Sequence, residues 1–192
     1  KFLHAGLGFG GSCFPKDTQA LVRIGEEHDR PMSIVAAAIA VNAALPGLAF
    51  AKARRLLGDP QGKAVALLGL SFKPNTDDIR QAGSLELTRL LLAAGATIRA
   101  HDPVAMPNFK KAYPDLTYCR NAYETCEGAD IVVLVTEWNQ YRQLDLGHLG
   151  EIMRGRAFLD CRNVYNHERL AEHGFAYDCF GRPATAFTEV VS

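Results

Sequence analysis

The sequence predicts an α/β fold built on a parallel β-sheet, and three observations support this. Short apolar runs, AVALLGL (64–70) and DIVVLVT (130–136), have the length and composition of buried strands. Amphipathic stretches of helical period, such as SLELTRLLLAAG (84–95), alternate with the strands. This alternation begins only after the turn-rich segment DPQGK (59–63). The pattern favours a Rossmann-like parallel sheet with helices on both faces.

Two segments are therefore predicted, a helical connecting segment over residues 1–58 and the sheet domain over residues 59–192. After a glycine-rich loop, Pro15 fits the first position of a helix, because a proline there loses no hydrogen bond. The inward face of this helix is expected to carry Leu21, Val22 and Ile24. Pro31 is expected to open a second helix.

Apolar residues recur in the second helix at intervals of four and three: Ile34, Ala38, Val41, Leu45 and Leu48. This spacing is typical of a helix that packs along a seam, either in a core or against its own copy in a homodimer through residues 31–57. Pro46-Gly47 falls inside the pattern and is expected to kink or break the helix.

The sheet domain contains further elements of the same two kinds. Ser84 is expected to cap the helix that follows it, and Gly95 to close that helix. The remaining strands are expected at 96–102, near 116–119, at 157–161 and at 175–179, with helices near 121–127, 146–153 and 166–174.

Composition restricts the possible functions. Among 192 residues, Lys plus Arg equals Asp plus Glu, 21 each, so no net charge favours a nucleic acid or an anionic membrane. No apolar run is expected to reach membrane-spanning length. Five cysteines without CxxC spacing and six scattered histidines argue against disulfides and a metal site, and fit a reducing cytoplasm. The start, KFLHAGLGFGG, lacks Met and a signal peptide, so the chain is expected to begin inside a longer protein or to have been trimmed.

The first motif with chemical potential is FGGSCFPKD (9–17). A cysteine at a helix N-terminus beside a lysine is favoured as thiolate, so Cys13 is either a nucleophile or a small buried hydrophobe. Asp17 lies one helical turn further and can position or deprotonate a water. The glycines in GLGFGG allow a ligand to approach the backbone, but no strand precedes them, which excludes a dinucleotide fingerprint.

The second motif, GLSFKPNTDDIRQAGS (69–84), follows a strand and precedes a helix, where parallel sheets bind ligands. Lys73 and Arg80 can contact phosphate and Phe72 can stack on a base. The alternative is that Asp77, Asp78 and Arg80 only pair with one another.

Three residues at other strand ends complete the set. Asp102, before Pro103, is interpreted as a turn former instead of a ribose ligand. Arg162, in DCRN (160–163), faces the crevice or lies on the surface. Trp138, the one tryptophan, is interpreted as a packing residue.

Together these stretches resemble the nucleotide-sugar 6-dehydrogenase family. The carriers of the resemblance are KFLHAGLGFGGSCFPKDT, LLGLSFKPNTDDIRQAGS followed by AHDP, VTEWNQY and DCRN, in that order along the chain. The resemblance implies oxidation of C6 of a UDP-sugar from alcohol to acid with two NAD+. A cysteine captures the aldehyde as a thiohemiacetal, and water cleaves the thioester that follows.

The resemblance also implies roles for individual residues. Cys13 matches the nucleophile and Asp17 the residue that acts on water. The other matches are substrate contacts at His4, Gly8, Phe9, Gly10, Phe72, Lys73 and Arg162, and contacts toward NAD at Lys16 and Arg80.

The chain lacks the family's N-terminal NAD-binding domain, so NAD is expected to be bound mainly outside these residues and the isolated chain is expected to be inactive. FKPNTDD and FPKDT lean toward UDP-glucose as substrate. GDP-mannose and a UDP-N-acetylhexosamine are the alternatives, and a further alternative is a nucleotide-sugar binding module without catalysis.

Overall fold

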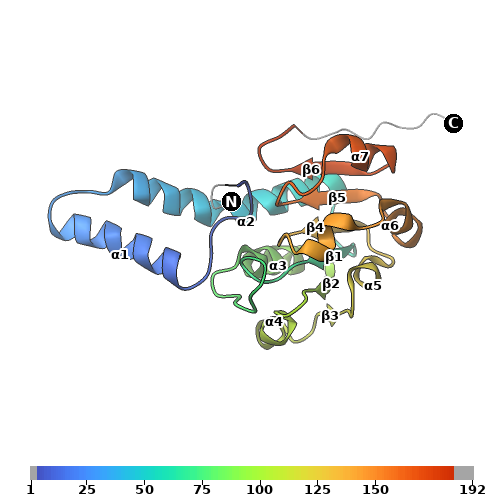
Figure 1. Cartoon of the computed structure of the whole chain (residues 1–192), viewed down its shortest axis with the longest axis horizontal. Coiled ribbons are helices and arrows are strands. Elements are labelled where there is room, and N and C mark those ends of the chain that lie inside the picture. Colours follow the sequence, from blue (N-terminus) through green and yellow to red (C-terminus); the bar gives the residue numbers. More distant parts are fainter. Residues whose placement is uncertain (1–3, 184–192) are drawn as a thin grey trace.

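The computed structural model describes residues 4–183 and consists of a helical hairpin beside a six-stranded parallel sheet (Figure 1). The hairpin is formed by α1 (Cys13–Glu27) and α2 (Ser33–Leu57). The strands run in the order β3-β2-β1-β4-β5-β6, and the order reverses between β1 and β4, as in a Rossmann fold. The strands are β1 (Ala64–Leu68), β2 (Thr97–His101), β3 (Thr117–Tyr118), β4 (Ile131–Leu134), β5 (Ala157–Asp160) and β6 (Ala176–Cys179).

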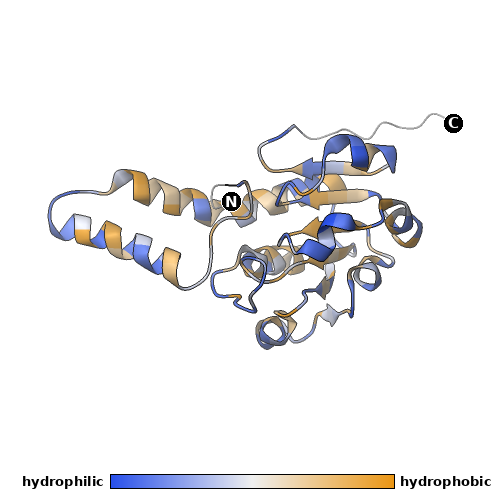
Figure 2. Cartoon of the chain, in the orientation of Figure 1, coloured by the Kyte–Doolittle hydropathy of each residue, from blue (hydrophilic) through white to orange (hydrophobic). Residues whose placement is uncertain are grey.

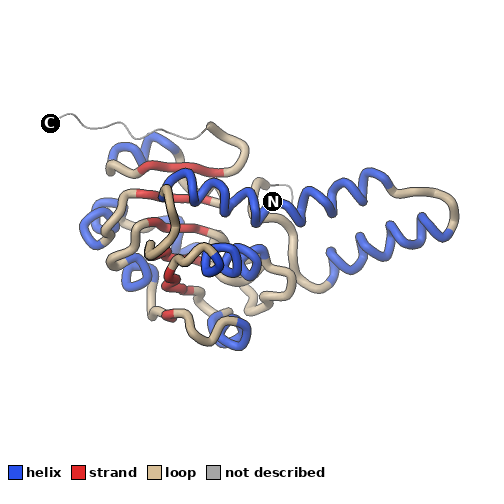
Figure 3. The backbone as a smooth tube through the Cα atoms, turned by 180° about the vertical axis from the view of Figure 1, so that it is seen from behind, coloured by secondary structure: helices blue, strands red, loops and turns tan. Residues whose placement is uncertain are grey.

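Helices cover both faces of the sheet, which confirms the predicted fold class (Figure 3). Successive strand residues point to opposite faces, so Val65 and Leu67 join one core while Ala66 and Leu68 join the other. The first core includes residues of α2, α3 and α4, and the second includes residues of α5, α6 and α7. These helices are α3 (Gly83–Ala93), α4 (Met106–Ala112), α5 (Ala122–Cys126), α6 (Leu146–Ile152) and α7 (His167–Glu172).

Helix α2 continues through Pro46 without a break, so the predicted break is wrong. A proline removes one backbone hydrogen bond, and packing of the following turns against the sheet domain compensates for that loss. Ala49 and Ala53 have no exposed surface, because their small side chains let the helix approach the sheet closely. One uninterrupted helix therefore joins the hairpin to the sheet.

The hairpin exposes several apolar residues among polar ones (Figure 2). Leu21 and Ile24 of α1 are 42% and 52% exposed, so the prediction that they face inward is wrong for the chain by itself. In α2, Ile34 and Val41 are 87% and 63% exposed. The predicted apolar stripe is therefore present, but its N-terminal half is not covered by the rest of the chain.

Helix α2 is also long and apolar enough to cross a membrane by length and composition. This contradicts the prediction that no apolar run reaches that length, since residues 34–51 carry no charge. Core packing of its C-terminal half gives one reason for this composition, because Ala49 and Ala53 lie in the core of the sheet domain. Composition alone therefore does not exclude a membrane.

Several predicted helix ends and capping residues are wrong. Helix α1 starts at Cys13, two residues before Pro15. Ser84 does not cap α3, because it lies inside the helix and donates its hydroxyl to the carbonyl of Leu70 at 2.6 Å. Helix α4 and a 3-10 helix at Asn139–Gln143 were not predicted.

A buried carboxylate fixes the end of α2 on the sheet. Asp178 of β6 is fully buried, and Lys52 donates to it at 2.9 Å. Arg55 contacts the second carboxylate oxygen. Because an unpaired buried charge is costly, these two cations and Asp178 hold α2 and β6 together.

Asp102 orders the loops at the carboxyl edge of the sheet. It is fully buried, and its Oδ2 accepts from the backbone N–H groups of Leu70 and Ser71 and from Trp138 Nε1, at 2.7, 3.2 and 3.0 Å. Its Oδ1 accepts from the backbone N–H groups of Val104 and Ala105. The predicted turn at Asp102 and the packing role of Trp138 are both confirmed.

Asp102→Asn is expected to lower the free energy of unfolding by about 2–3 kcal/mol, because an amide nitrogen would face buried donors in place of a carboxylate oxygen. Urea unfolding followed by the fluorescence of Trp138 measures this. The control is Asp115→Asn, at an exposed carboxylate, which is expected to leave the midpoint unchanged. Equal midpoints for the two variants would contradict the role of Asp102.

Candidate active site

The predicted substrate residues of the sheet domain follow the carboxyl ends of two parallel strands that are separated by β4. Phe72 and Lys73 follow β1, and Arg162 follows β5. The strand order reverses between β1 and β4, and ligands of such sheets bind in the crevice at that point. Phe72 is half-buried, while Lys73 is exposed with its Nζ 5.3 Å from the centre of the Phe72 ring. The two residues form an aromatic and basic surface at this edge.

The glycine-rich loop before α1 lies directly on the loop between β1 and α3. The backbone N–H of Gly11 donates to the carbonyl of Arg80 at 2.7 Å. A Cβ on Gly10 would lie 2.5 Å from the carbonyl oxygen of Gln81, so only glycine allows this approach. Two motifs about seventy residues apart are therefore brought together.

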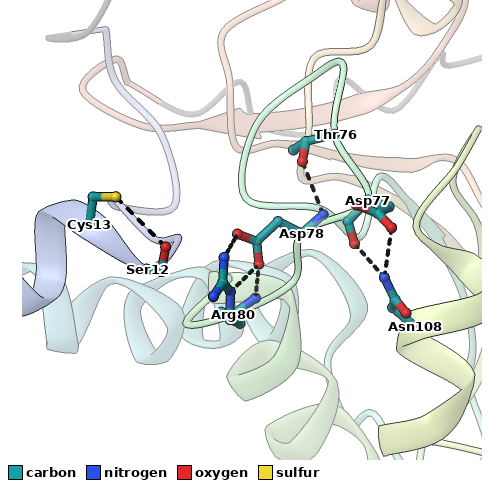
Figure 4. A network of polar contacts seen from close by, with 7 residues as sticks. All are labelled: Ser12, Cys13, Thr76, Asp77, Asp78, Arg80 and Asn108. Atoms are coloured by element: carbon teal, nitrogen blue, oxygen red, sulfur yellow. Dashed lines mark hydrogen bonds and ion pairs between the residues drawn. The ribbon is translucent and has the colours of Figure 1, made fainter.

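Cys13 is the first residue of α1, and its side chain is exposed (Figure 4). Its Sγ lies 3.8 Å from Ser12 Oγ. Position at a helix N-terminus places backbone N–H groups and the positive end of the helix dipole near the thiol. The other four cysteines are buried, so Cys13 is the accessible thiol among the described residues.

Asp17 and Lys16, on the next turn of α1, pair with each other. Lys16 Nζ lies 2.5 Å from Asp17 Oδ1, and both side chains are mostly exposed. The hydrogen bond that Lys16 donates to Asp17, and then the negative charge of Asp17, raise the pKa of Lys16 above its usual value. The Asp17 carboxylate would have to exchange this partner before it could act on a water.

Arg80, the predicted NAD contact, is held by Asp78 (Figure 4). Its Nε and Nη2 lie 3.0 and 2.8 Å from the two carboxylate oxygens. The hydrogen bond to Arg80 lowers the pKa of Asp78. Asp77 instead accepts from Asn108 at 3.0 Å. Arg80 and Asp78 therefore pair with each other, as the alternative interpretation of this motif predicted. The Arg80 side chain is still mostly exposed.

Arg162 forms the best-shielded ion pair of the site, with Glu137. Its Nε and Nη2 lie 2.5 and 2.6 Å from the two oxygens of Glu137, and both side chains are about four-fifths buried. The guanidinium also lies against Gly6, so Arg162 touches the loop that leads to Cys13. His4, in the same loop, is exposed.

The backbone of Phe9 is hydrogen-bonded to a side chain of α2. Asn42 Oδ1 accepts from the N–H of Phe9 at 2.7 Å, and Asn42 Nδ2 donates to the Phe9 carbonyl at 3.0 Å. The Phe9 ring packs edge-on against Phe14, with centroids 4.6 Å apart. Gly8 has a φ of 91°, which L side chains rarely adopt.

A cavity of about 380 Å³ lies beside this loop, between α1, α2 and the start of α3. Of the predicted site residues it includes only Phe9, and its other walls are mainly apolar, including Leu7, Ile39 and Pro46. It does not include Cys13, Lys73 or Arg162, so it is separate from the predicted chemistry.

The described residues do not form a pyrophosphate site for NAD. The N–H groups after β1 that would face a phosphate, those of Leu70 and Ser71, already donate to Asp102. Within residues 4–183, the GLGFGG loop precedes a helix and follows no strand. Lys16 and Arg80, the predicted contacts toward NAD, both have mostly exposed side chains. In the same range, no cluster of three His, Cys, Asp or Glu could hold a metal ion.

Sequence reasoning missed Glu137 and Asn42. Glu137 follows β4 at the same sheet edge as Arg162, so its position after a strand was an available signal. Asn42 is the only amide in the otherwise apolar residues 34–51, and an amide in such a stretch usually has a specific partner.

The fold and the site together define a Rossmann-like α/β domain with a cysteine-bearing loop docked at the edge where nucleotides bind. Residues 66–167 match the UDP binding domain, and residues 1–44 the central domain, of the UDP-glucose/GDP-mannose dehydrogenase family. The chain belongs to this family of nucleotide-sugar dehydrogenases, which confirms the resemblance found in the sequence.

Individual relatives agree with this assignment. The chain is 43% identical to the UDP-glucose 6-dehydrogenase of Rhizobium meliloti and 46% identical to that of Pseudomonas aeruginosa, over 95% of this chain and 42% of each relative. A solved UDP-glucose dehydrogenase from Pyrobaculum islandicum aligns with a TM-score of 0.79 at 39% identity, over 90% of this chain and 38% of that one.

The NDP-N-acetyl-D-galactosaminuronic acid dehydrogenase of Methanosarcina mazei aligns with a TM-score of 0.81 at 28% identity, over 92% of this chain and 39% of that one. The chain thus spans about two fifths of the length of these relatives.

Glu137→Gln is expected to reduce the free energy of unfolding by about 2 kcal/mol at pH 7, because it removes the charge that partners Arg162. Burial raises the pKa of Glu137, but the hydrogen bond and charge of Arg162 outweigh burial and bring the pKa below its ordinary value of 4.5. A depressed folded-state pKa gives stability that is present above pH 4.5 and is lost as the pH falls through the folded value.

The difference between wild type and Glu137→Gln should therefore shrink below pH 4.5, measured by urea unfolding at matched pH values. Glu151→Gln, at a 79% exposed carboxylate, should show little difference at either pH. A Glu137 difference that is constant with pH would contradict the charged pair.

Proposed function

We propose that this chain is the UDP-binding and nucleophile-bearing part of an NAD-dependent UDP-glucose 6-dehydrogenase, which oxidises UDP-glucose to UDP-glucuronate. The observation that carries the proposal is the docking of the exposed Cys13 at a helix N-terminus onto the nucleotide edge of the sheet. The identity of 43% and 46% to UDP-glucose 6-dehydrogenases favours UDP-glucose as the sugar nucleotide.

The substrate is proposed to lie along the edge formed by Phe72, Lys73 and Arg162. Phe72 stacks on the base and Lys73 pairs with the diphosphate, as their aromatic and cationic side chains allow. Arg162 binds a polar group of the substrate while Glu137 holds its guanidinium in place. The loop of His4, Gly8, Phe9 and Gly10 covers the sugar and brings C6 to Cys13.

The proposed reaction changes an alcohol at C6 into a carboxylate. The thiolate of Cys13 adds to the C6 aldehyde, forming a C–S bond and a thiohemiacetal that keeps the aldehyde bound. Loss of a hydride converts this adduct to a thioester, and water cleaves the C–S bond to release the carboxylate and the thiol. Asp17 takes the proton from that water after leaving Lys16.

Two hydrides leave C6 in the overall change, and NAD+ is the acceptor that the family resemblance implies. Because the backbone N–H groups after β1 are occupied by Asp102 and the loop lacks a dinucleotide fingerprint, NAD is proposed to be bound mainly by residues outside this chain, with Lys16 and Arg80 as peripheral contacts. The boundary between the connecting segment (1–58) and the sheet domain (59–192) also remains a prediction.

The test uses the full-length protein and two variants with opposite expected effects. Cys13→Ser is expected to reduce NADH formation from UDP-glucose by at least about 10³-fold while keeping the affinity for UDP-glucose. Lys73→Ala is expected to weaken that affinity by about tenfold or more, since it loses a charge-assisted contact. Rates and calorimetric titrations measure the two effects.

The alternatives give different results in the same experiment. A binding module without catalysis predicts no NADH formation by wild type and unchanged binding in Cys13→Ser. A sister enzyme predicts faster turnover of GDP-mannose or a UDP-N-acetylhexosamine than of UDP-glucose. Equal affinity in Lys73→Ala and wild type would remove Lys73 from the site.

We also propose that the protein forms a homodimer through the exposed apolar stripe of α2. Val41→Glu would place a charge in that interface and is expected to yield monomers, measured by sedimentation velocity over a range of concentrations. Val104→Glu is the matched control, because Val104 is 46% exposed but lies outside the hairpin. An unchanged dimer in Val41→Glu would contradict an interface on α2.

A further inference from the structure

The contact between Asn42 and Phe9 joins helix α2 to the loop that carries Cys13. A half-buried amide in an apolar helix is costly unless its polar atoms are satisfied. Here both are satisfied by one residue, since Asn42 bonds the N–H and the carbonyl of Phe9 at 2.7 and 3.0 Å. The donor and the acceptor on Phe9 also fix which way the amide points.

Core packing of Leu7 and the bond from Gly11 to Arg80 hold the loop on either side of Phe9, and the two bonds of Asn42 hold the Phe9 backbone between them. Glycines flank Phe9 on both sides, and glycine loses the most conformational entropy when it is ordered. A backbone bond joins Gly11 of this loop to Arg80. A Cβ on Gly8 would lie 2.4 Å from Asn42 Oδ1, so the amide fills the space that this glycine leaves open.

Phe9 in turn contacts the first turn of α1, which begins at Cys13. The Phe9 ring packs on Phe14, which follows Cys13 in the first turn of α1. Helix α2 is itself fixed to the sheet by Asp178, so Asn42 sets the place of Cys13 relative to the nucleotide edge. A displacement of a reacting group by about 1 Å can cost about 100-fold in rate.

We propose that Asn42 is a positioning residue for Cys13, acting through the backbone of Phe9 without touching the substrate. The inference rests on the proposed function for its effect on turnover, but its effect on the loop can be measured independently of turnover.

Asn42→Asp offers a specific test, because its carboxyl group has the shape of the amide. The ionised form accepts from the Phe9 N–H but repels the Phe9 carbonyl, whereas the protonated form can donate to that carbonyl again. Two other titratable groups line the same cavity, Glu86 and Tyr113. The hydrogen bond from Arg89 lowers the pKa of Glu86 and burial raises the pKa of Tyr113, so neither changes charge between pH 5 and 8.

The experiment uses the full-length protein with Asn42→Leu, Asn42→Asp and the control Asn166→Asp, at a helix cap where Asp serves as well as Asn. Amide exchange of residues 6–14 is followed by mass spectrometry, and kcat for NADH formation by absorbance. Asn42→Leu is expected to speed exchange and lower kcat, each about tenfold or more. In Asn42→Asp, both values should differ most from wild type at pH 8, where the carboxyl group is ionised, and should return toward wild type as it becomes protonated at lower pH.

Unchanged exchange in Asn42→Leu, or unchanged exchange in Asn42→Asp at pH 8, would overturn the inference. Normal kcat in Asn42→Leu with active wild type would overturn it while leaving the proposed function intact. If wild type forms no NADH, the proposed function fails, and the exchange ratios alone decide whether Asn42 positions the loop.

Discussion

The carboxylate of Asp102 is the constraint on which the candidate site depends. This buried carboxylate accepts hydrogen bonds from backbone N–H groups that follow β1 and β2 and from the indole N–H of Trp138. Because the N–H groups of Leu70 and Ser71 donate to Asp102, a phosphate at this edge depends on side chains such as Lys73 and not on those backbone groups. The same bonds hold the β1–α3 loop in the shape on which the glycine-rich loop rests. A Rossmann-like sheet thereby presents a platform for a second loop in place of a phosphate cradle.

Much of the fold could be predicted because buried parallel strands are short and continuously apolar, as in 64–70 and 130–136. The errors occur where tertiary contacts override local preference. Pro46 does not break α2, because packing of Ala49 and Ala53 stabilises the following turns. The apolar face of α1 was assigned inward on the assumption that the chain covers its own helices, and Ile24 shows that it does not.

The site was predictable to the extent that strand topology determines it. Carboxyl ends of parallel strands meet at one edge, so Phe72 and Arg162, each predicted at a strand end, follow β1 and β5 at the same edge of the sheet. The partners of these residues were not predictable, because Glu137 and Arg162 are far apart in the chain and many carboxylates could have served. Asn42 shows the same limit, since its side chain carried a signal but its partner Phe9 did not.

Helix α2 makes two contacts that have to agree in direction. Asn42 faces the glycine-rich loop, and Lys52 faces the buried carboxylate of β6. One residue inserted or deleted between them would turn Asn42 by about 100° around the helix axis relative to Lys52. The helix between these two residues therefore cannot change in length without loss of one of the two contacts. The turn at residues 28–32, between α1 and α2, can change in length without altering either contact.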